Sequence, residues 1–551
     1  MKKFTIFTMM AAATMFANAQ RPTSTEEPNR GKLAQNVTLA PTAHAGIAKA
    51  KAATTVEFSD IISEMPEGEV KSYVRYGSSF FSYYGYIYFD LQNGIPLDLV
   101  MASDGKTVYL KDPIANLQYG NWVKGTIEEN QIHLPLYQTL CETTDGVFGL
   151  VKSDMVDNGD GSVTWIPDYE ATEVIFTIED DGTLKLQGTE ANETGYGSSL
   201  LAAIDIATDK WTGFGDFETV FVPLTDEIMS VPKSVEFEDF TCKDDNGVNL
   251  VKVGIEGDRI YILDLFTAPL VGTIEGDKVT FATDQYLGLN RGYYEFATTA
   301  NYEIIVHDDG YYWEEVIYHA LPSLEYVYDA ENKTIAPAAE KVAFVSNRGK
   351  SDYGISTVST YYRDASFKPF VEVAEAPVTP YFYYYSGEYD GQWGFYFFTP
   401  NETVSGEYIM KDKLEWAVYT DEDIFTFTAD DGYALSEDMT WFPTGFVDDN
   451  YGWDIFCDGD AMLVTLYMYT TLCNEVGIQS RATFDGVIYY SDICYCDVKT
   501  GETRVVEYTD PVGINNVATQ PSVRLFDLQG RRMEKMSNGL MIRNGKVVFM
   551  K

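Results

Sequence analysis

Short apolar runs alternate with turn-forming pairs along most of the chain. From about residue 56 to 345, runs rich in tyrosine, phenylalanine and β-branched residues are separated by Asp-Gly, Asn-Gly and Gly-Asp pairs, as in YYGYIYFDLQNG, DGKTVYLKDP and VIFTIEDDGTLKL. Alternation over such short runs is typical of half-buried strands, and the turn pairs are typical of hairpins. The pattern predicts an all-β chain of consecutive antiparallel strands.

One stretch of this pattern occurs twice. The segment DGKTVYLKDPIANLQYGNWVKGTIEENQIHLPLYQTL, from Asp104, aligns with GDRIYILDLFTAPLVGTIEGDKVTFATDQYLG, from Gly257. Both copies contain GTIE, followed at equal spacing by an apolar residue and then by a glutamine, Gln138 or Gln285. The repetition predicts a duplicated antiparallel β-domain, barrel- or sandwich-like, with a shorter connection before GTIE in the second copy.

The expected copies cover residues 55–230 and 231–345. Within them, Ile127 and Ile274 are expected in the core, because they occupy matching positions on a period-two strand. The glutamines have two interpretations: they satisfy backbone groups at the edge of a domain, or they contact a ligand. Residues 346–375 lack a clear pattern and are predicted to form a linker.

A third all-β region is predicted over residues 376–509. It begins with PYFYYYSGEYDGQWGFYFF and ends with EVGIQSRATFDGVIYYSDICYCDV. The combination of GIQS, a hairpin at Asp485 and Gly486, and a final strand with YSDI resembles fibronectin type III-like modules in large secreted proteins of Bacteroides and Prevotella relatives. The resemblance implies an immunoglobulin-like sandwich, which agrees with about seven short predicted strands.

The first residues indicate export. MKKFTIFTMMAAATMFANAQ has a basic start, an apolar run and small residues before Gln20, which together predict a signal peptide over residues 1–19. Residues 20–54 have no apolar period and are expected to form a flexible lead-in. The apolar run is too short to span a bilayer, and no later stretch has about twenty uncharged apolar residues, so no membrane-spanning segment is expected.

The last residues, 510–551, form a predicted C-terminal module with a β-hairpin. LFDLQGRR, a spacer and GLMIRNGKVVFMK resemble the C-terminal sorting domain of the type IX secretion system, with Met541 where the family usually has tyrosine. The resemblance implies recognition by the secretion machinery, and display at the outer-membrane surface of a Gram-negative bacterium or release from it. The matching residues are Gly530, Arg531, Arg532, Gly539 and Lys551. The alternative is a solvated terminal hairpin.

Charge and cysteine content narrow the range of partners. With 84 acidic and 39 basic residues the net charge is -45, so the surface potential repels nucleic acids and anionic lipids. The six cysteines are too few and too scattered for a disulfide scaffold in a chain of this length. They are expected to lie mostly in the core.

Motifs for catalysis and cofactors are absent from the sequence. The four histidines form no HExxH motif, there is no GxSxG elbow, and Gly105, Lys106 and Thr107 lack the upstream glycine of a phosphate-binding loop. No catalytic residue, metal ligand or cofactor is therefore assigned. Acidic turns at Asp157 and Asp448 could hold a structural calcium ion, but neither has the EF-hand spacing.

The aromatic cluster YFYYYSGEYDGQWGFYFF suggests a ligand. Tyrosine and tryptophan faces stack on sugar rings, so Tyr385, Tyr389 and Trp393 are candidates for a glycan platform. The alternative is that these residues are core and cross-strand pairs. The sequence favours a secreted, non-catalytic binding or adhesion protein for a glycan or a host surface protein. A secreted carbohydrate-active enzyme and a purely structural surface component remain alternatives.

Overall fold

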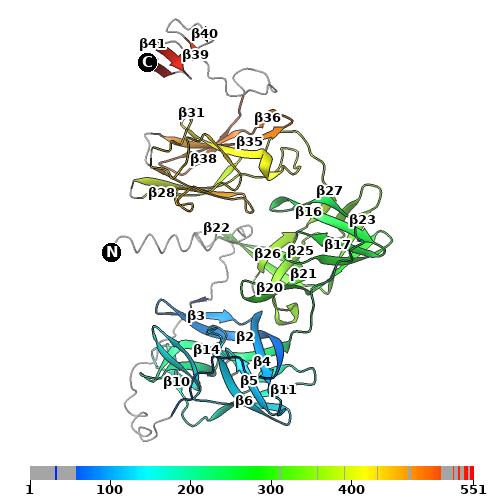
Figure 1. Cartoon of the computed structure of the whole chain (residues 1–551), viewed down its shortest axis with the longest axis vertical. Helices are drawn as coiled ribbons and strands as arrows, with labels where there is room; N and C mark the ends of the chain where they lie inside the picture. Colours follow the sequence, from blue (N-terminus) through cyan, green and yellow to red (C-terminus); the bar gives the residue numbers. More distant parts are fainter. Residues whose placement is uncertain are drawn as a thin grey trace. The chain divides into compact units, whose positions relative to one another are not determined.

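The computed structural model describes residues 57–308, 312–355, 358–389, 391–430, 432–469 and 473–509, with short strands at 32–33, 525–526, 532–533, 539–543 and 546–550. Within these residues the helical elements are the 3-10 turns η1 (Ser351–Tyr353) and η2 (Lys411–Lys413). All other elements are strands, and every pairing between them is antiparallel, so the all-β prediction is confirmed. The chain divides into an N-terminal unit, Met1–Phe370, and a C-terminal unit, Val371–Lys551 (Figure 1).

The N-terminal unit contains two domains. The strands of the first domain are β1 (Lys32–Leu33), β2 (Glu69–Tyr83), β3 (Tyr86–Leu91), β4 (Ile95–Met101), β5 (Thr107–Lys111), β6 (Trp122–Glu128), β7 (Gln131–Pro135), β8 (Thr139–Thr143), β9 (Gly146–Asp157), β10 (Val163–Pro167), β11 (Glu173–Ile178), β12 (Leu184–Leu186), β13 (Ser199–Asp205) and β14 (Lys210–Pro223).

Eight of these strands close into a ring. They pair in the order β2-β4-β5-β6-β7-β11-β12-β14, and β14 pairs back to β2. Every strand of the ring contributes to one buried cluster, from Tyr73 on β2 to Phe221 on β14. An eight-stranded barrel has an interior just wide enough for side chains or one small ligand, and here side chains fill it. Strands β8, β9, β10 and β13 form a side sheet that joins the ring through β14.

The second domain follows directly. Its strands are β15 (Phe237–Asp244), β16 (Gly247–Glu256), β17 (Arg259–Leu263), β18 (Leu270–Glu275), β19 (Lys278–Ala282), β20 (Gln285–Asn290), β21 (Tyr293–Asp308), β22 (Tyr312–Ala320), β23 (Ser323–Asp329), β24 (Thr334–Pro337), β25 (Val342–Arg348), β26 (Val358–Arg363) and β27 (Ser366–Pro369).

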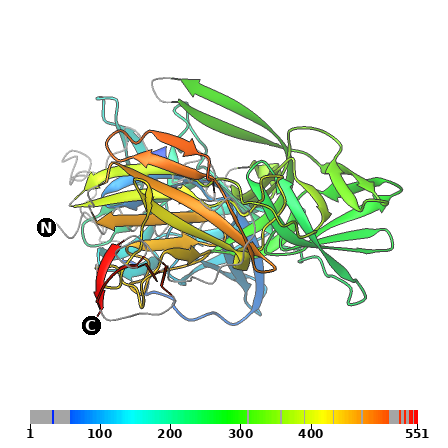
Figure 2. The same cartoon turned by 90° about the horizontal axis from the view of Figure 1, so that it is seen from above.

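The second domain repeats the topology of the first. Its closed barrel runs β15-β16-β17-β18-β19-β23-β24-β27, and its side sheet contains β20, β21, β22, β25 and β26. In both domains the chain enters the side sheet after the fifth strand of the barrel, β7 or β19, and returns to the barrel at the sixth, β11 or β23. Strand β14 of the first domain corresponds to β26 and β27 together, because β26 pairs with β25 while β27 closes the barrel. Strands β21 and β22 form a long hairpin that projects from the domain (Figure 2).

The two glutamines of the repeated segment make the same hydrogen bonds. Gln138 Oε1 accepts from the Lys124 amide at 2.7 Å, while its Nε2 donates to the carbonyls of Lys124 and Pro135. Gln285 Oε1 accepts from the Val271 amide at 2.9 Å, and its Nε2 donates to the carbonyls of Val271 and Ala282. Both side chains therefore serve backbone groups of the strand that carries GTIE, as the first interpretation expected.

The isoleucines of GTIE are only partly buried. Ile127 and Ile274 pack against the cores of the first and second barrel, respectively. Each lies one residue before the end of its strand, so one side of the side chain remains open to solvent. The prediction that both isoleucines contact the core is correct, but neither side chain is fully buried.

The predicted linker over residues 346–375 is wrong for most of its length. Strands β26 and β27 lie within it, and β27 pairs with β15 and β24 to close the second barrel. The second domain therefore extends to Pro369 rather than to residue 345. The physical reason is the closure itself, because β15 and β24 would otherwise leave unpaired ladder groups at an open edge.

The C-terminal unit contains the remaining strands. They are β28 (Tyr381–Tyr389), β29 (Gln392–Phe398), β30 (Leu414–Thr420), β31 (Asp423–Ile424), β32 (Trp441–Pro443), β33 (Ile455–Asp458), β34 (Leu463–Tyr469), β35 (Glu475–Phe484), β36 (Val487–Tyr490), β37 (Ile493–Asp497), β38 (Thr503–Val506), β39 (Leu525–Phe526), β40 (Arg532–Met533), β41 (Gly539–Arg543) and β42 (Lys546–Met550).

Two sheets of this unit enclose a common core. A four-stranded sheet, β28-β29-β34-β33, and a seven-stranded sheet built around β30, β35 and β37 both contribute to one buried cluster. These two sheets form a β-sandwich, and its finer resemblance to fibronectin type III-like modules stays a prediction.

The expected export signals fall largely outside the described residues. Residues 1–19, Gly530, Arg531 and Lys551 all lie outside them, as does most of the lead-in. Arg532 lies on β40 and Gly539 on β41, in a four-stranded sheet formed by β39 to β42. The resemblance to a sorting domain therefore stays a prediction.

Candidate functional site

Two of the three residues predicted for the glycan platform are turned into the protein. Trp393 is only 7% exposed and lies in the core between the two sheets. Tyr385 is half-buried, its ring stacks on Phe395 at 5.0 Å, and its hydroxyl donates to the Val498 carbonyl at 2.7 Å. The backbone of Tyr389 pairs with Gln392, and its side chain lies outside the described residues. The predicted platform is therefore wrong for Trp393 and Tyr385, because both belong to the inward-facing set.

The outward-facing aromatic residues of the same strand are three other tyrosines. Tyr381, Tyr383 and Tyr384 are 48%, 55% and 56% exposed. A register shift between Phe382 and Tyr384 places Tyr383 outside the regular ladder, so two consecutive tyrosines face solvent. Because β28 is an edge strand of its sheet, these side chains are accessible within the unit.

Aromatic side chains continue across the outer face of this sheet. The rings of Tyr384 and Tyr396 lie 5.6 Å apart, and those of Tyr396 and Tyr467 lie 6.3 Å apart. The hydroxyls of Tyr396 and Tyr467 share a hydrogen bond of 2.7 Å. Burial and this bond raise the pKa of Tyr396. We call this surface the tyrosine face; its members are Tyr381, Tyr383, Tyr384, Tyr396, Phe398 and Tyr467.

A glycine lets Tyr467 lie close to strand β29. A Cβ at Gly394 would lie 3.0 Å from Cε1 of Tyr467 and 2.5 Å from Oγ of Ser386. With glycine there, the Tyr467 ring packs against the backbone of β29 instead of standing above it. The result is a row of rings across β28, β29 and β34, with hydroxyl groups at its surface.

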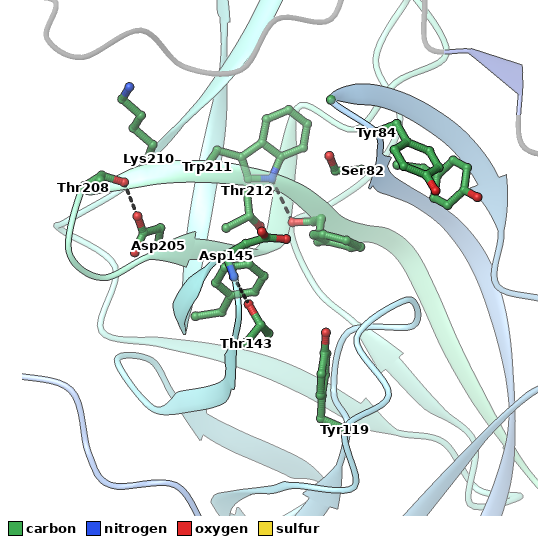
Figure 3. Close-up of a pocket in the computed structure, with 14 residues that line it drawn as sticks. Ser82, Tyr84, Tyr119, Thr143, Asp145, Asp205, Thr208, Lys210, Trp211 and Thr212 are labelled. Atoms are coloured by element: carbon green, nitrogen blue, oxygen red, sulfur yellow. Dashed lines mark hydrogen bonds between the residues drawn. The ribbon is translucent and has the colours of Figure 1, made fainter. Parts of the chain in front are cut away.

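The first domain carries a concave site that the sequence did not predict. An open cleft of about 730 Å³ lies between the β2–β3 turn, the connection from β5 to β6, the β8–β9 turn and the β13–β14 turn (Figure 3). Trp211 forms part of its floor, is 1% exposed, and donates from Nε1 to the Phe214 carbonyl at 2.8 Å.

Three exposed tyrosines line the cleft. Tyr83, Tyr84 and Tyr119 are 50%, 77% and 54% exposed, and Tyr84 and Tyr119 come from different sides of the opening (Figure 3). Burial, followed by the nearby Cys141 and Asp145, raises the pKa of Tyr119. The cleft was missed because its walls come from four turns that are far apart in the sequence.

The carboxylates of the cleft differ in their hydrogen bonds to residues of their own turns. The Asp205 carboxylate accepts from the Ala207 amide at 3.1 Å and from the Thr208 hydroxyl at 2.5 Å (Figure 3). Asp145 donates its amide to Thr143 Oγ1 at 3.0 Å, while its side chain is exposed at the cleft. Asp145 thus offers a carboxylate to a ligand, while the amine of Lys210 points away from the other labelled residues (Figure 3).

The acidic turns considered for calcium are organised by their own backbone. Asp448 accepts four amide hydrogen bonds, from Asn450, Gly452, Asp454 and Ile455. Asp157 accepts from the Gly159 amide. In the part of the chain that the structure describes, no group of three or more histidine, cysteine or acidic side chains is arranged to hold a metal ion.

Comparison with family models, curated proteins and solved structures finds no match to this chain. Among the described residues, no helix is long and apolar enough to cross a membrane.

Proposed function

We propose that the chain is a secreted, surface-displayed, non-catalytic protein that binds glycans through the tyrosine face. The observation that carries the proposal is the row of tyrosines across β28, β29 and β34, three of which are about half exposed. Export and display are supported by the signal-like start and by the resemblance of the tail to a sorting domain.

The composition of the tyrosine face favours a sugar over a purely apolar ligand. An exposed patch of large aromatic residues marks an interaction surface. Tyrosine offers an apolar ring for the C–H face of a sugar and a hydroxyl for its polar edge. Neighbouring strands are about 4.8 Å apart, so rings on adjacent strands can follow successive sugars of an extended chain. A row of rings that extends over three strands suits a polymer better than a small molecule, which needs a concave pocket.

The proposal is tested by sedimenting the full chain with insoluble cellulose, chitin, xylan and starch. The unaltered protein is expected to bind at least one of these. Replacing Tyr384 and Tyr396 by alanine should weaken binding by about tenfold or more, because an aromatic contact contributes about 0.5–1.5 kcal/mol beyond its area.

The matched control is Tyr451→Ala in the same unit. Tyr451 is 92% exposed and lies outside the tyrosine face, so its loss should leave binding unchanged. Retention of full binding by the double variant, or absence of binding to all four polysaccharides, would contradict the proposal.

A further inference from the structure

The two copies of the β-domain differ where the first one has its cleft. In the first domain β2 continues into a hairpin with β3, and the turn of that hairpin carries Tyr83 and Tyr84. In the second domain β15 turns directly into β16, which pairs with it along its whole length. The β3 hairpin, and with it one wall of the cleft, is therefore an addition present only in the first copy.

The opposite wall is a second addition. Tyr119 lies in the connection between β5 and β6, residues 112–121, whereas the corresponding connection in the second domain is residues 264–269. Extra residues in surface connections tend to carry function, because the barrel beneath them does not need them. Both tyrosine-bearing walls of the cleft thus come from segments that the fold itself does not require.

A buried ion pair holds the Tyr119 connection in place. Arg75 donates to the carbonyls of Asp112 and Pro113 at 2.6 and 3.0 Å, and the amide of Ala115 donates to Asp216 at 2.8 Å. The side chains of Arg75 and Asp216 are completely buried, and Arg75 Nη1 lies 3.5 Å from Asp216 Oδ2. Both sides of this pair are thereby bound to the start of the connection.

The far end of the connection is fixed as well. The Asp112 carboxylate accepts from the amides of Tyr119, Gly120 and Asn121 at 2.9–3.2 Å. In the second domain the residue that corresponds to Arg75 is Cys242, which pairs with Phe367 as Arg75 pairs with Phe221. The ion pair therefore occurs together with the longer connection, and with Asp112 it fixes the backbone on both sides of the segment that leads to Tyr119.

In the second domain, the turns that match the β8–β9 and β13–β14 turns of the cleft are covered. There the β20–β21 turn and the connection after β25 contact the first domain: the Tyr294 amide donates to the Gly94 carbonyl, and the Lys350 amide to the Tyr76 hydroxyl, both at 2.8 Å. The Tyr76 ring stacks on Tyr353 at 3.8 Å. The matching turns of the first domain, by contrast, line an open cleft.

We infer that the cleft of the first domain binds a short oligosaccharide segment, as a second glycan site separate from the tyrosine face. The inference rests on the proposed function for the class of ligand. A volume of about 730 Å³ lies within the usual size of small-molecule sites, about 300–1,000 Å³. Tyr84 and Tyr119 supply walls for sugar rings, while Asp145 accepts from sugar hydroxyls.

The test is calorimetric titration of the full chain with cellohexaose, chitohexaose, xylohexaose and maltohexaose, each used separately. At least one is expected to bind. Tyr84→Ala and Tyr119→Ala should each weaken that binding about 2- to 10-fold, and Asp145→Asn should weaken it about tenfold. The same variants should still sediment with polysaccharide through the tyrosine face.

The controls separate the two sites. Tyr451→Ala should leave hexasaccharide binding unchanged, and so should the Tyr384 and Tyr396 double variant. Unchanged hexasaccharide affinity in all three cleft variants overturns the inference, as does the absence of heat with all four sugars when the protein still sediments with polysaccharide. Absence of both kinds of binding overturns the proposed function as well.

Discussion

Replacing the two repeated glutamines by alanine tests whether the β-domains are equivalent in energy as well as in topology. Gln138 and Gln285 each bridge three backbone groups of matching strands. In each copy the variant removes the acceptor for one amide and the donor for two carbonyls. We expect both variants to loosen the end of the strand that carries GTIE.

The expected magnitudes follow from burial. A buried polar group left without a partner costs about 1–3 kcal/mol, and Gln138 is only 8% exposed. Because water can reach some of the groups, Gln138→Ala should cost about 2–4 kcal/mol rather than the full sum. Gln285 is more exposed, so Gln285→Ala should cost about 1–3 kcal/mol.

Amide hydrogen exchange is the appropriate assay, because a chain with several domains does not unfold in one step. The amides to follow are those of Lys124 and Val271, which donate to the two glutamines. The Lys124 amide should exchange about 30- to 1,000-fold faster in Gln138→Ala, and the Val271 amide about 5- to 150-fold faster in Gln285→Ala. Each variant serves as the control for the other domain.

A glutamate at the same position sharpens the test. Gln138→Glu puts an oxygen where Nε2 now donates to the carbonyls of Lys124 and Pro135. Repulsion favours the protonated carboxyl, so the destabilisation should be small near about pH 4 and grow towards about pH 7. Exchange rates at Lys124 that do not change in either Gln138 variant would refute the bridging role.

Two further predictions concern the cysteines and the tail. Burial raises the pKa of Cys141, Cys457 and Cys496 to about 11. Among the six cysteines only Cys473 is not buried. A thiol reagent should therefore modify Cys473 first and all six only after denaturation. Fast modification of two or more thiols in the native protein would contradict this burial. A chain truncated after Thr509 should stay folded but accumulate in the periplasm of its native host, whereas equal surface labelling of full-length and truncated protein would leave the tail as a solvated hairpin.

The duplication could be predicted because it depends on local sequence. The GTIE strand, the residues after it and the bridging glutamine are close together in the chain, so both copies keep a visible pattern. The end of the second domain could not be predicted in the same way. Strand β27 is short, and its partner β15 lies far away in sequence, so nothing local distinguishes SFKP from a linker.

The tyrosine face and the cleft could be predicted from the sequence only in part. Alternation in YFYYYSGEYDGQWGFYFF predicts two faces, but aromatic residues occupy both, and the pattern does not reveal which face is buried. The bulge at Tyr383 also shifts the phase along β28, so Tyr385 points inward with Phe382. The cleft left no signal, because Tyr84, Tyr119 and Asp145 meet only after the barrel has closed.

Each barrel is entered and left by the chain at adjoining points. In the first domain Tyr73 on β2 pairs with Pro223 on β14, and in the second Phe240 on β15 pairs with Pro369 on β27. A gene segment that encodes such a barrel can be copied in tandem without dividing any strand pair between the copies. The same adjacency would let the original ends be joined and new ends be opened at an exposed turn. The closure of the ring thus makes the domain a unit that can be duplicated whole, and each copy can then carry surface segments of its own, such as the β3 hairpin in the first domain and the long β21–β22 hairpin in the second.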